Sequence, residues 1–513
     1  MILAPPPAPT GRFQPMRTLC SLALAATAVL LLIAPTLIAL FRHSPPLLAI
    51  ILAVLLAIPV LSLPEGRREL GKHIQSIPQG ALFLASAGLL LWLAFRSIFS
   101  PVHTVALGVA AQFLGGIVLA AVLAVLARIH QDDRLLLWLL WGVLIATVSV
   151  IVDAVSFRLW MRDEGLRQMI GLTPRESNAN RAAVLMTLMV PFMIVLLAHR
   201  HRERWLVTLA LAASLLAIVV SHSESAKAAL VIGLISYTLV HYLNGRGVFA
   251  VAVLSVMAVL TMPVIGGQAI HLLPKVFYDA TNPGTFEIRA HIWESFTAHI
   301  WDRPIFGTGI ESSRIVLSAA GNPIGSVQHL NNHPHNAILQ IWFELGLVGV
   351  ALLSAVIGIF LRRTEDLPIR DQVVRTALFG MIFAVSCVSH GAWQAWWPCL
   401  IGIVLVGYPR AQSINLATIF PHPLRALSGL EYARIQRRLL QSVESRRLIE
   451  YRPASRDDQQ HQAQRDEKID HGATASSDRI LSSSHAVVFK NPPRLRKTAS
   501  KSGHKPKKPR AID

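Results

Sequence analysis

Long apolar runs with almost no charge are the feature that most limits how this chain can fold. Residues 19–41, 102–126 and 248–270 are examples, and each is long enough to cross a bilayer as a helix of about 20 residues. Only 15% of the residues are charged, against about 25% in ordinary soluble domains. Backbone N–H and C=O groups must pair within the chain inside lipid. We therefore expect an all-α, polytopic membrane bundle.

Twelve spans divide the chain into three parts. A cytoplasmic segment at 1–18 precedes a transmembrane domain at 19–408, and a basic, largely disordered tail follows at 409–513. The tail holds 21 Lys and Arg residues against 10 Asp and Glu residues, a composition that does not favour a packed core. The predicted spans are residues 19–41, 47–63, 81–99, 102–127, 135–156, 182–198, 205–221, 226–243, 248–270, 340–361, 373–390 and 393–408.

Basic residues gather in alternate loops, and cytoplasmic loops carry an excess of Lys and Arg. With twelve spans both termini lie on one side, which this rule makes the cytoplasm. The loop at 271–334 is then outside. The loops expected inside carry Arg67, Arg68, Lys72, Arg128, Arg134, Arg200, Arg202, Arg204, Arg246, Arg362, Arg363 and Arg370.

One outer segment breaks this rule. Residues 157–181 are expected outside and are short, and Lys227 begins the eighth span from the same side. Two interpretations stay open: an anionic ligand at the outer surface, or pairing with the segment's own acidic residues or with lipid phosphates. The cations of this segment are Arg158, Arg162, Arg167, Arg175 and Arg181.

The outer loop at 271–334 is too long for a bare connection. Its residues 286–301 carry apolar side chains at helical spacing, which predicts an amphipathic helix with Arg289 at the border of the apolar stripe. Pro304 should end this helix. Gly307-Thr308-Gly309 then predicts a tight turn.

A further helix is expected to begin at His333-Pro334-His335-Asn336. Proline suits the first helical position, which would put His335 in the first turn. A helix N-terminus attracts anions and favours a neutral imidazole that can accept a proton. The alternative is a polar residue that only marks the water interface.

Two stretches, one within this loop and one that begins at its end, resemble a known family. HPHNAILQIWFELGLVGVALL, from His333, is similar to the H-N-x9-G-x-x-G signature of the O-antigen ligase and polymerase family. RAHIWESFTAHIWDRPIFGTGIESSR, from Arg289, is similar to the family's upstream landmark. The resemblance covers about residues 205–361. Family members often have an arginine where this chain has Lys227, and Lys lacks the bidentate fork that grips phosphate.

The resemblance implies a membrane glycosyltransferase of the bacterial cytoplasmic (inner) membrane with a periplasmic active site. Such enzymes transfer a glycan from an undecaprenyl-pyrophosphate carrier to a lipid-linked acceptor sugar, which is lipid A-core for a ligase. For a polymerase of O-antigen or exopolysaccharide it is another carrier-linked repeat. Arg289 and Lys227, with Arg181, are expected to hold the pyrophosphate. His335 is the candidate base, and Asn336 and Arg314 are expected to position the sugar.

This chemistry needs no cofactor, because cations can stabilise the leaving pyrophosphate and a histidine can accept the hydroxyl proton. A single displacement would invert the anomeric centre. We expect a metal-independent enzyme with membrane lipids as neighbours and no nucleic-acid partner. His329, His333 and His335 offer an alternative metal cluster. A transporter is the competing class, but the cations gather at one face instead of the midplane.

Smaller features complete the expectations. Gly346 and Gly349 should give one span a small face for close helix packing, and Trp393, Trp396 and Trp397 should anchor the outer interface. The three cysteines lie in apolar runs and are expected to be packing residues. Residues 430–449 can form a basic amphipathic helix on the anionic inner leaflet, or belong to a disordered tail.

Overall fold

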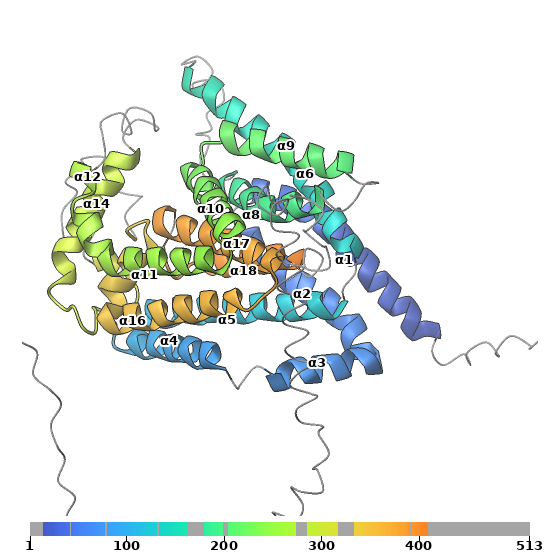
Figure 1. The fold of residues 1–513 in the computed structure, drawn as a ribbon, viewed down its shortest axis with the longest axis horizontal. Coiled ribbons are helices and arrows are strands. Elements are labelled where there is room, and N and C mark those ends of the chain that lie inside the picture. The colour runs from blue at the N-terminus through green and yellow to red at the C-terminus, as the bar shows by residue number, and fades with distance from the viewer. Residues whose placement is uncertain are drawn as a thin grey trace, which may run out of the picture. The chain divides into compact units, whose positions relative to one another are not determined.

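The computed structural model describes residues 14–41, 43–76, 80–130, 133–162, 179–197, 204–272, 285–315, 333–389 and 391–408. Within these ranges all regular secondary structure is α-helical (Figure 1). The helices are α1 (Gln14–Leu40), α2 (Ser44–Ser62), α3 (Pro64–Ser76), α4 (Ala81–Ile98), α5 (His103–His130), α6 (Asp133–Arg162), α8 (Asn180–Leu197), α9 (Arg204–Val220), α10 (Glu224–Leu243), α11 (Gly245–Gly267), α12 (Ala269–Leu272), α14 (Thr285–Ile300), α16 (Ala337–Glu365), α17 (Ile369–Val388) and α18 (Trp396–Leu405).

The helices have the length and apolarity of membrane spans. In the described part of the chain, ten are long and apolar enough to cross a bilayer, and α9 and α18 are apolar but shorter. Each of the twelve predicted spans coincides with one of these helices. Large apolar side chains face outward, such as Leu84 and Leu91, which are 67% and 70% exposed. The all-α polytopic prediction is confirmed, and the protein is an integral membrane protein.

α10 and α17 run antiparallel in close contact. A Cβ atom added at Gly233 of α10 would collide with the Met381 side chain, and one at Gly380 of α17 would collide with the Ser236 hydroxyl. The two glycines therefore let the helices approach closely, as small residues do between membrane helices. This pairing brings the start of α10 beside the end of α17.

α16 is interrupted at Gly346, whose φ of 63° and ψ of −165° are not helical. The turn after α14 docks into this break. Thr308 N donates to Phe343 O at 2.9 Å, Gly309 N to Glu344 O at 3.0 Å, and Leu347 N to Pro304 O at 2.8 Å. The peptide groups that the break frees are thus paired with the turn, as an apolar environment requires.

This arrangement corrects the expectation for the two glycines. A Cβ atom at Gly346 would collide with the Ile305 carbonyl, so the close neighbour is the docked turn instead of another helix. At Gly349 a Cβ atom would meet the Leu345 side chain of the same helix. The turn itself is as predicted, with positive φ at Gly307 and Gly309.

α12 and α14 lie at the end of α11 and α16 (Figure 1). α14 is the amphipathic helix that the sequence predicts, since Ile292, Trp293, Phe296 and Ile300 are buried. It ends at Ile300, ahead of Pro304. Among the predicted features, the tail at 409–513 with its helix at 430–449, together with Arg167, Arg175 and His329, lies outside the described residues.

Candidate active site

The start of α10 carries a carboxylate and an ammonium group in contact. Ser223 caps the helix by accepting a hydrogen bond from Ala226 N, a common role for serine. One turn later Lys227 Nζ lies 3.0 Å from Glu224 Oε1, and both side chains are 36% exposed. A cap and an i,i+3 pair thus fix Lys227 at the helix start with its ammonium group open to water.

Arg289 of α14 belongs to the same charged cluster. Burial lowers the pKa of its guanidinium, and the negative charge of Glu224 opposes this shift. Glu224 thus contacts Lys227 directly and acts on Arg289 at longer range through its charge. Because burial disfavours the charged guanidinium of Arg289, an anion bound beside it would stabilise that charge.

His335 precedes α16 instead of lying in its first turn. The N-cap is Asn336, whose side chain accepts from Leu339 N at 3.0 Å. His335 has a φ of +53°, in the left-handed region that histidine tolerates better than most residues. The prediction that Pro334 starts the helix is wrong, because an asparagine cap satisfies a free N–H that proline cannot satisfy.

The segment after α17 holds the two histidines. His335 Nδ1 lies 3.3 Å from Ser389 O, and His333 Nε2 lies 2.8 Å from Gln394 Nε2. The two imidazole rings meet edge to face with centroids 4.4 Å apart. The backbone oxygen of Ser389 and the side-chain amide of Gln394 thus orient the two rings.

Arg181 at the start of α8 reaches this segment through an aromatic ring. Its guanidinium lies 4.1 Å from the centroid of Trp396, within the range of a cation–π contact. Trp396 Nε1 donates to Gln394 Oε1 at 2.6 Å, and Gln394 contacts His333. Arg181 and the histidines, which are far apart in sequence, are thereby connected in space.

Asn336 and Arg314 have more local partners. Asn336 is 1% exposed, and its amide nitrogen contacts Met262 Sδ at 3.3 Å while its oxygen caps α16. Arg314 pairs with Glu311 of its own turn, and its side chain is 42% exposed. The Asn336 side chain is thus buried and its oxygen caps the helix, whereas Arg314 stays accessible.

Glu344 and Trp393 are the residues that sequence reasoning missed or misassigned. Trp393 was expected at the interface but is 5% exposed, and its Nε1 donates to Glu344 Oε2 at 2.5 Å. Glu344 is fully buried in α16. The available signal was a carboxylate within an apolar span, since ionisable residues there tend to be functional.

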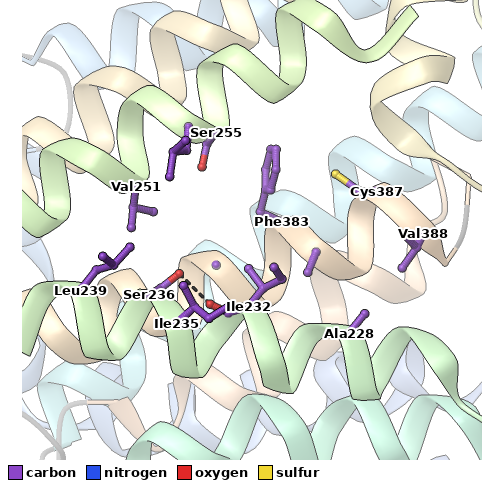
Figure 2. Close-up of a pocket in the computed structure, with 13 residues that line it drawn as sticks. Ala228, Ile232, Ile235, Ser236, Leu239, Val251, Ser255, Phe383, Cys387 and Val388 are labelled. Atoms are coloured by element: carbon purple, nitrogen blue, oxygen red, sulfur yellow. Dashed lines mark hydrogen bonds between the residues drawn. The ribbon is translucent and has the colours of Figure 1, made fainter. Parts of the chain in front are cut away.

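An apolar pocket of about 440 Å³ lies between α10, α11 and α17 (Figure 2). Figure 2 shows Leu239 and Val251 toward one end and Ala228 and Val388 toward the other. The Ser236 hydroxyl in its wall is already bonded to Ile232 O at 2.8 Å. The Ala228 end is adjacent in sequence to Lys227, and Val388 to Ser389. An apolar pocket therefore ends beside the charged cluster and the His335 contact.

In the described ranges no group of three or more His, Cys, Asp or Glu side chains is arranged to hold a metal ion. The three cysteines are free, with Cys20 and Cys399 buried and Cys387 partly buried.

Comparison with known families finds a match to this part of the chain. The family model described as O-antigen ligase matches residues 207–354. This region belongs to the O-antigen ligase family. It contains Lys227, Arg289, Arg314, His335 and Asn336, whereas Arg181 lies before it. The O-antigen ligase region runs from α9 to the middle of α16, so it includes both the docked turn and the helix break.

Curated relatives carry the same kind of name. A "Putative polysaccharide ligase" of Rickettsia conorii is 28% identical over 209 residues, 40% of this chain and 50% of the relative. One of Rickettsia felis is 29% identical over 211 residues, covering 40% and 51%. One of Rickettsia typhi is 32% identical over 125 residues, covering 23% and 31%. The chain spans about half the length, or less, of these relatives.

Proposed function

We propose that this O-antigen ligase family protein transfers a glycan from an undecaprenyl-pyrophosphate carrier to a lipid-linked acceptor sugar. The observation that carries the proposal is the apolar pocket between α10, α11 and α17, which ends next to the Lys227–Glu224 pair. The charge of Glu224 also acts on Arg289 of α14. The apolar chain of such a carrier matches the pocket, and its pyrophosphate matches the cations beside the pocket.

The pocket suits the isoprenoid part of the donor. Burial of the apolar surface of an isoprenoid chain would favour binding by roughly 25 cal/mol per Å². Leu254 and Ile235 of its wall are 62% and 49% exposed, so the pocket opens where lipid would surround the bundle. A carrier can thus enter from the membrane with its head group already at the level of Lys227.

The pyrophosphate would be held by cations from three helices. Lys227 contacts Glu224, and the charge of Glu224 acts on Arg289. An incoming pyrophosphate would compete with that carboxylate for Lys227 and add negative charge near Arg289. Arg181, on Trp396, supplies a third positive charge. These groups would stabilise the negative charge that develops as the carrier leaves, which is work that a metal ion performs in other transferases.

His335 is the proposed base. Its ring accepts the proton from the acceptor hydroxyl as that oxygen bonds to the anomeric carbon. The bond from this carbon to the pyrophosphate oxygen breaks, and the carrier leaves as an anion. One displacement inverts the anomeric centre. Asn336 supports this step by capping α16 behind His335, and Arg314 is the exposed residue proposed to bind the sugar chain.

The site is proposed to face the periplasm from the cytoplasmic (inner) membrane, with both termini in the cytoplasm. The positive-inside rule supports this orientation. α16 begins at the site, and its other end carries Arg362 and Arg363. A Cβ atom at Gly80, near the basic helix α3, would collide with Arg363, so the basic segments gather at the end remote from the site.

A repeat-unit polymerase is the second candidate, because Lys227 stands where family ligases often have arginine. It would use the same donor but extend another carrier-linked repeat of O-antigen or exopolysaccharide, instead of acting on lipid A-core.

Deletion of the protein tests the proposal by showing which glycan remains on the carrier. A ligase predicts long chains that stay attached to undecaprenyl pyrophosphate and are absent from the surface. A polymerase predicts single carrier-linked repeats. Unchanged surface glycan with no carrier-linked intermediate would reject both candidates.

A further inference from the structure

Glu344 is a carboxyl group at the centre of the O-antigen ligase region. It is fully buried and lies two residues before the break at Gly346. Its Oε1 accepts from Gln340 Nε2 at 3.0 Å and Ser313 N at 3.4 Å. Its Oε2 accepts from Glu311 N at 2.9 Å and Trp393 Nε1 at 2.5 Å. Each oxygen thus receives two donors.

Three of these donors come from the two segments that hold the proposed site residues, and the fourth, Gln340, lies one turn earlier in α16. Glu311 and Ser313 belong to the turn that ends in Arg314. Trp393 precedes Gln394, which contacts His333. Gln340 adds a second link from Glu344 to the segment after α17, since its Nε2 donates to Glu344 and its oxygen accepts from Ala392 N at 2.8 Å. One buried side chain therefore joins the Arg314 turn to the segment that orients the histidines.

All four contacts are made by donors, so both oxygens of Glu344 must act as acceptors. A carboxylate satisfies all four bonds, because it has acceptor sites on both oxygens and no hydrogen of its own. A glutamine of the same shape would turn an NH₂ group toward two of these donors. Buried donors left without acceptors are costly, so the pattern requires the acid at this position.

We propose that Glu344 is a positioning residue for glycan transfer, holding the Arg314 turn and the His333–His335 support in register across the break in α16. This inference rests on the proposed transfer function. Glu344 acts through these segments, whereas Arg289 and Lys227 lie on α14 and α10. Its loss should therefore slow the transfer step and leave donor binding largely unchanged.

The test is steady-state transfer by the purified full-length protein in lipid vesicles, with an undecaprenyl-pyrophosphate-linked glycan as donor. Rates are normalised to the protein that binds donor, so that partial unfolding does not imitate a catalytic defect. For Glu344→Gln we expect kcat to fall by roughly ten- to a hundredfold, because small displacements of catalytic groups slow the reaction by such factors. KM for the donor should stay within about threefold, since the cation cluster is untouched. Glu365→Gln, at the far end of the same helix, is the matched control and should behave as wild type.

Trp393→Phe provides a second variant, because it removes one donor and keeps an aromatic ring. It should lower kcat by a smaller factor and leave KM for the donor unchanged. If Glu344→Gln does not fold, this variant tests the positioning role in its place. The double variant should be less impaired than the product of the two single losses, since both remove one contact. Folded variants with wild-type kcat, or a loss confined to KM, would overturn the positioning role. A wild-type protein without transfer would instead reject the underlying function.

Discussion

His335 and Asn336 are neighbours in sequence with different roles at the residue scale. Asn336 is buried and caps α16, while His335 is only partly buried and lies outside the helix with a positive φ. The motif H-N thus places the proposed base directly before the residue that caps the helix. The sequence could predict that a helix starts here. It could not decide between Pro334 and Asn336 as its start, because both residue types favour the first positions of a helix.

His335→Gly separates the imidazole from the backbone it sits on. Glycine removes the strain of a positive φ, which stabilises the fold by about 1 kcal/mol. It also makes the unfolded chain more flexible, which costs a similar amount of stability. Protein level and thermal stability should therefore hardly change. Glycan transfer should fall by about 10²–10⁴-fold, as expected on removal of a general base. Transfer near the wild-type rate, measured at matched protein levels, would remove His335 from the mechanism.

Arg289 is expected to need its guanidinium as well as its charge. In Arg289→Lys the bidentate contact with pyrophosphate is lost, at a cost of roughly 1.5–3 kcal/mol. The variant should bind or turn over the donor about ten- to a hundredfold less well. Arg246→Lys, an exposed position at the start of α11, is the control. Equal donor affinity and turnover for wild type and Arg289→Lys would contradict the bidentate role.

At the element scale, the two segments that resemble the family motifs, the turn after α14 and the first half of α16, pack against each other. The G-T-G turn after α14 docks into the break that Gly346 makes in α16. The helices themselves could be predicted, because each apolar run is long and α14 has a clear apolar stripe. The break could not, since the run from Ala337 onward stays apolar across it. The roles of Glu344 and Trp393 likewise follow only from contacts between segments distant in sequence.

Gly346→Ala tests the docked turn. Its φ and ψ lie in a region that is essentially restricted to glycine, and a Cβ atom would collide with the Ile305 carbonyl. We expect a loss of at least about 2 kcal/mol in stability, seen as earlier thermal unfolding in detergent. Gly358→Ala in the same helix meets no atom within 4 Å and should be neutral or slightly stabilising. Equal unfolding temperatures for the two variants would argue against the docking.

At the scale of the whole molecule, the described spans place the proposed site at one end of the bundle and basic segments such as Arg362 and Arg363 at the other. Charge asymmetry and span positions could be predicted from sequence because both depend on local composition. The positions of Arg181 and Lys227 relative to the histidines needed the three-dimensional packing of α8, α10 and α17.

The basic tail is expected to be dispensable for chemistry. In the proposed orientation it follows α18 on the cytoplasmic side, away from the site. Truncation after residue 412 should therefore leave transfer per inserted protein largely intact and mainly alter protein level or placement. Membrane insertion is checked by fractionation and transfer by surface glycan analysis. A correctly inserted truncation without activity would show that the tail has a further role.

The central claim is that side chains alone activate a lipid pyrophosphate donor, and reconstitution tests it most directly. Purified protein in vesicles, treated exhaustively with a chelator, is given an undecaprenyl-pyrophosphate-linked glycan and lipid A-core. We predict glycosylated lipid A-core and one released undecaprenyl pyrophosphate per transfer, with almost none from His335→Gly. Strict dependence on an added divalent ion, or product from His335→Gly at the wild-type rate, would contradict the account.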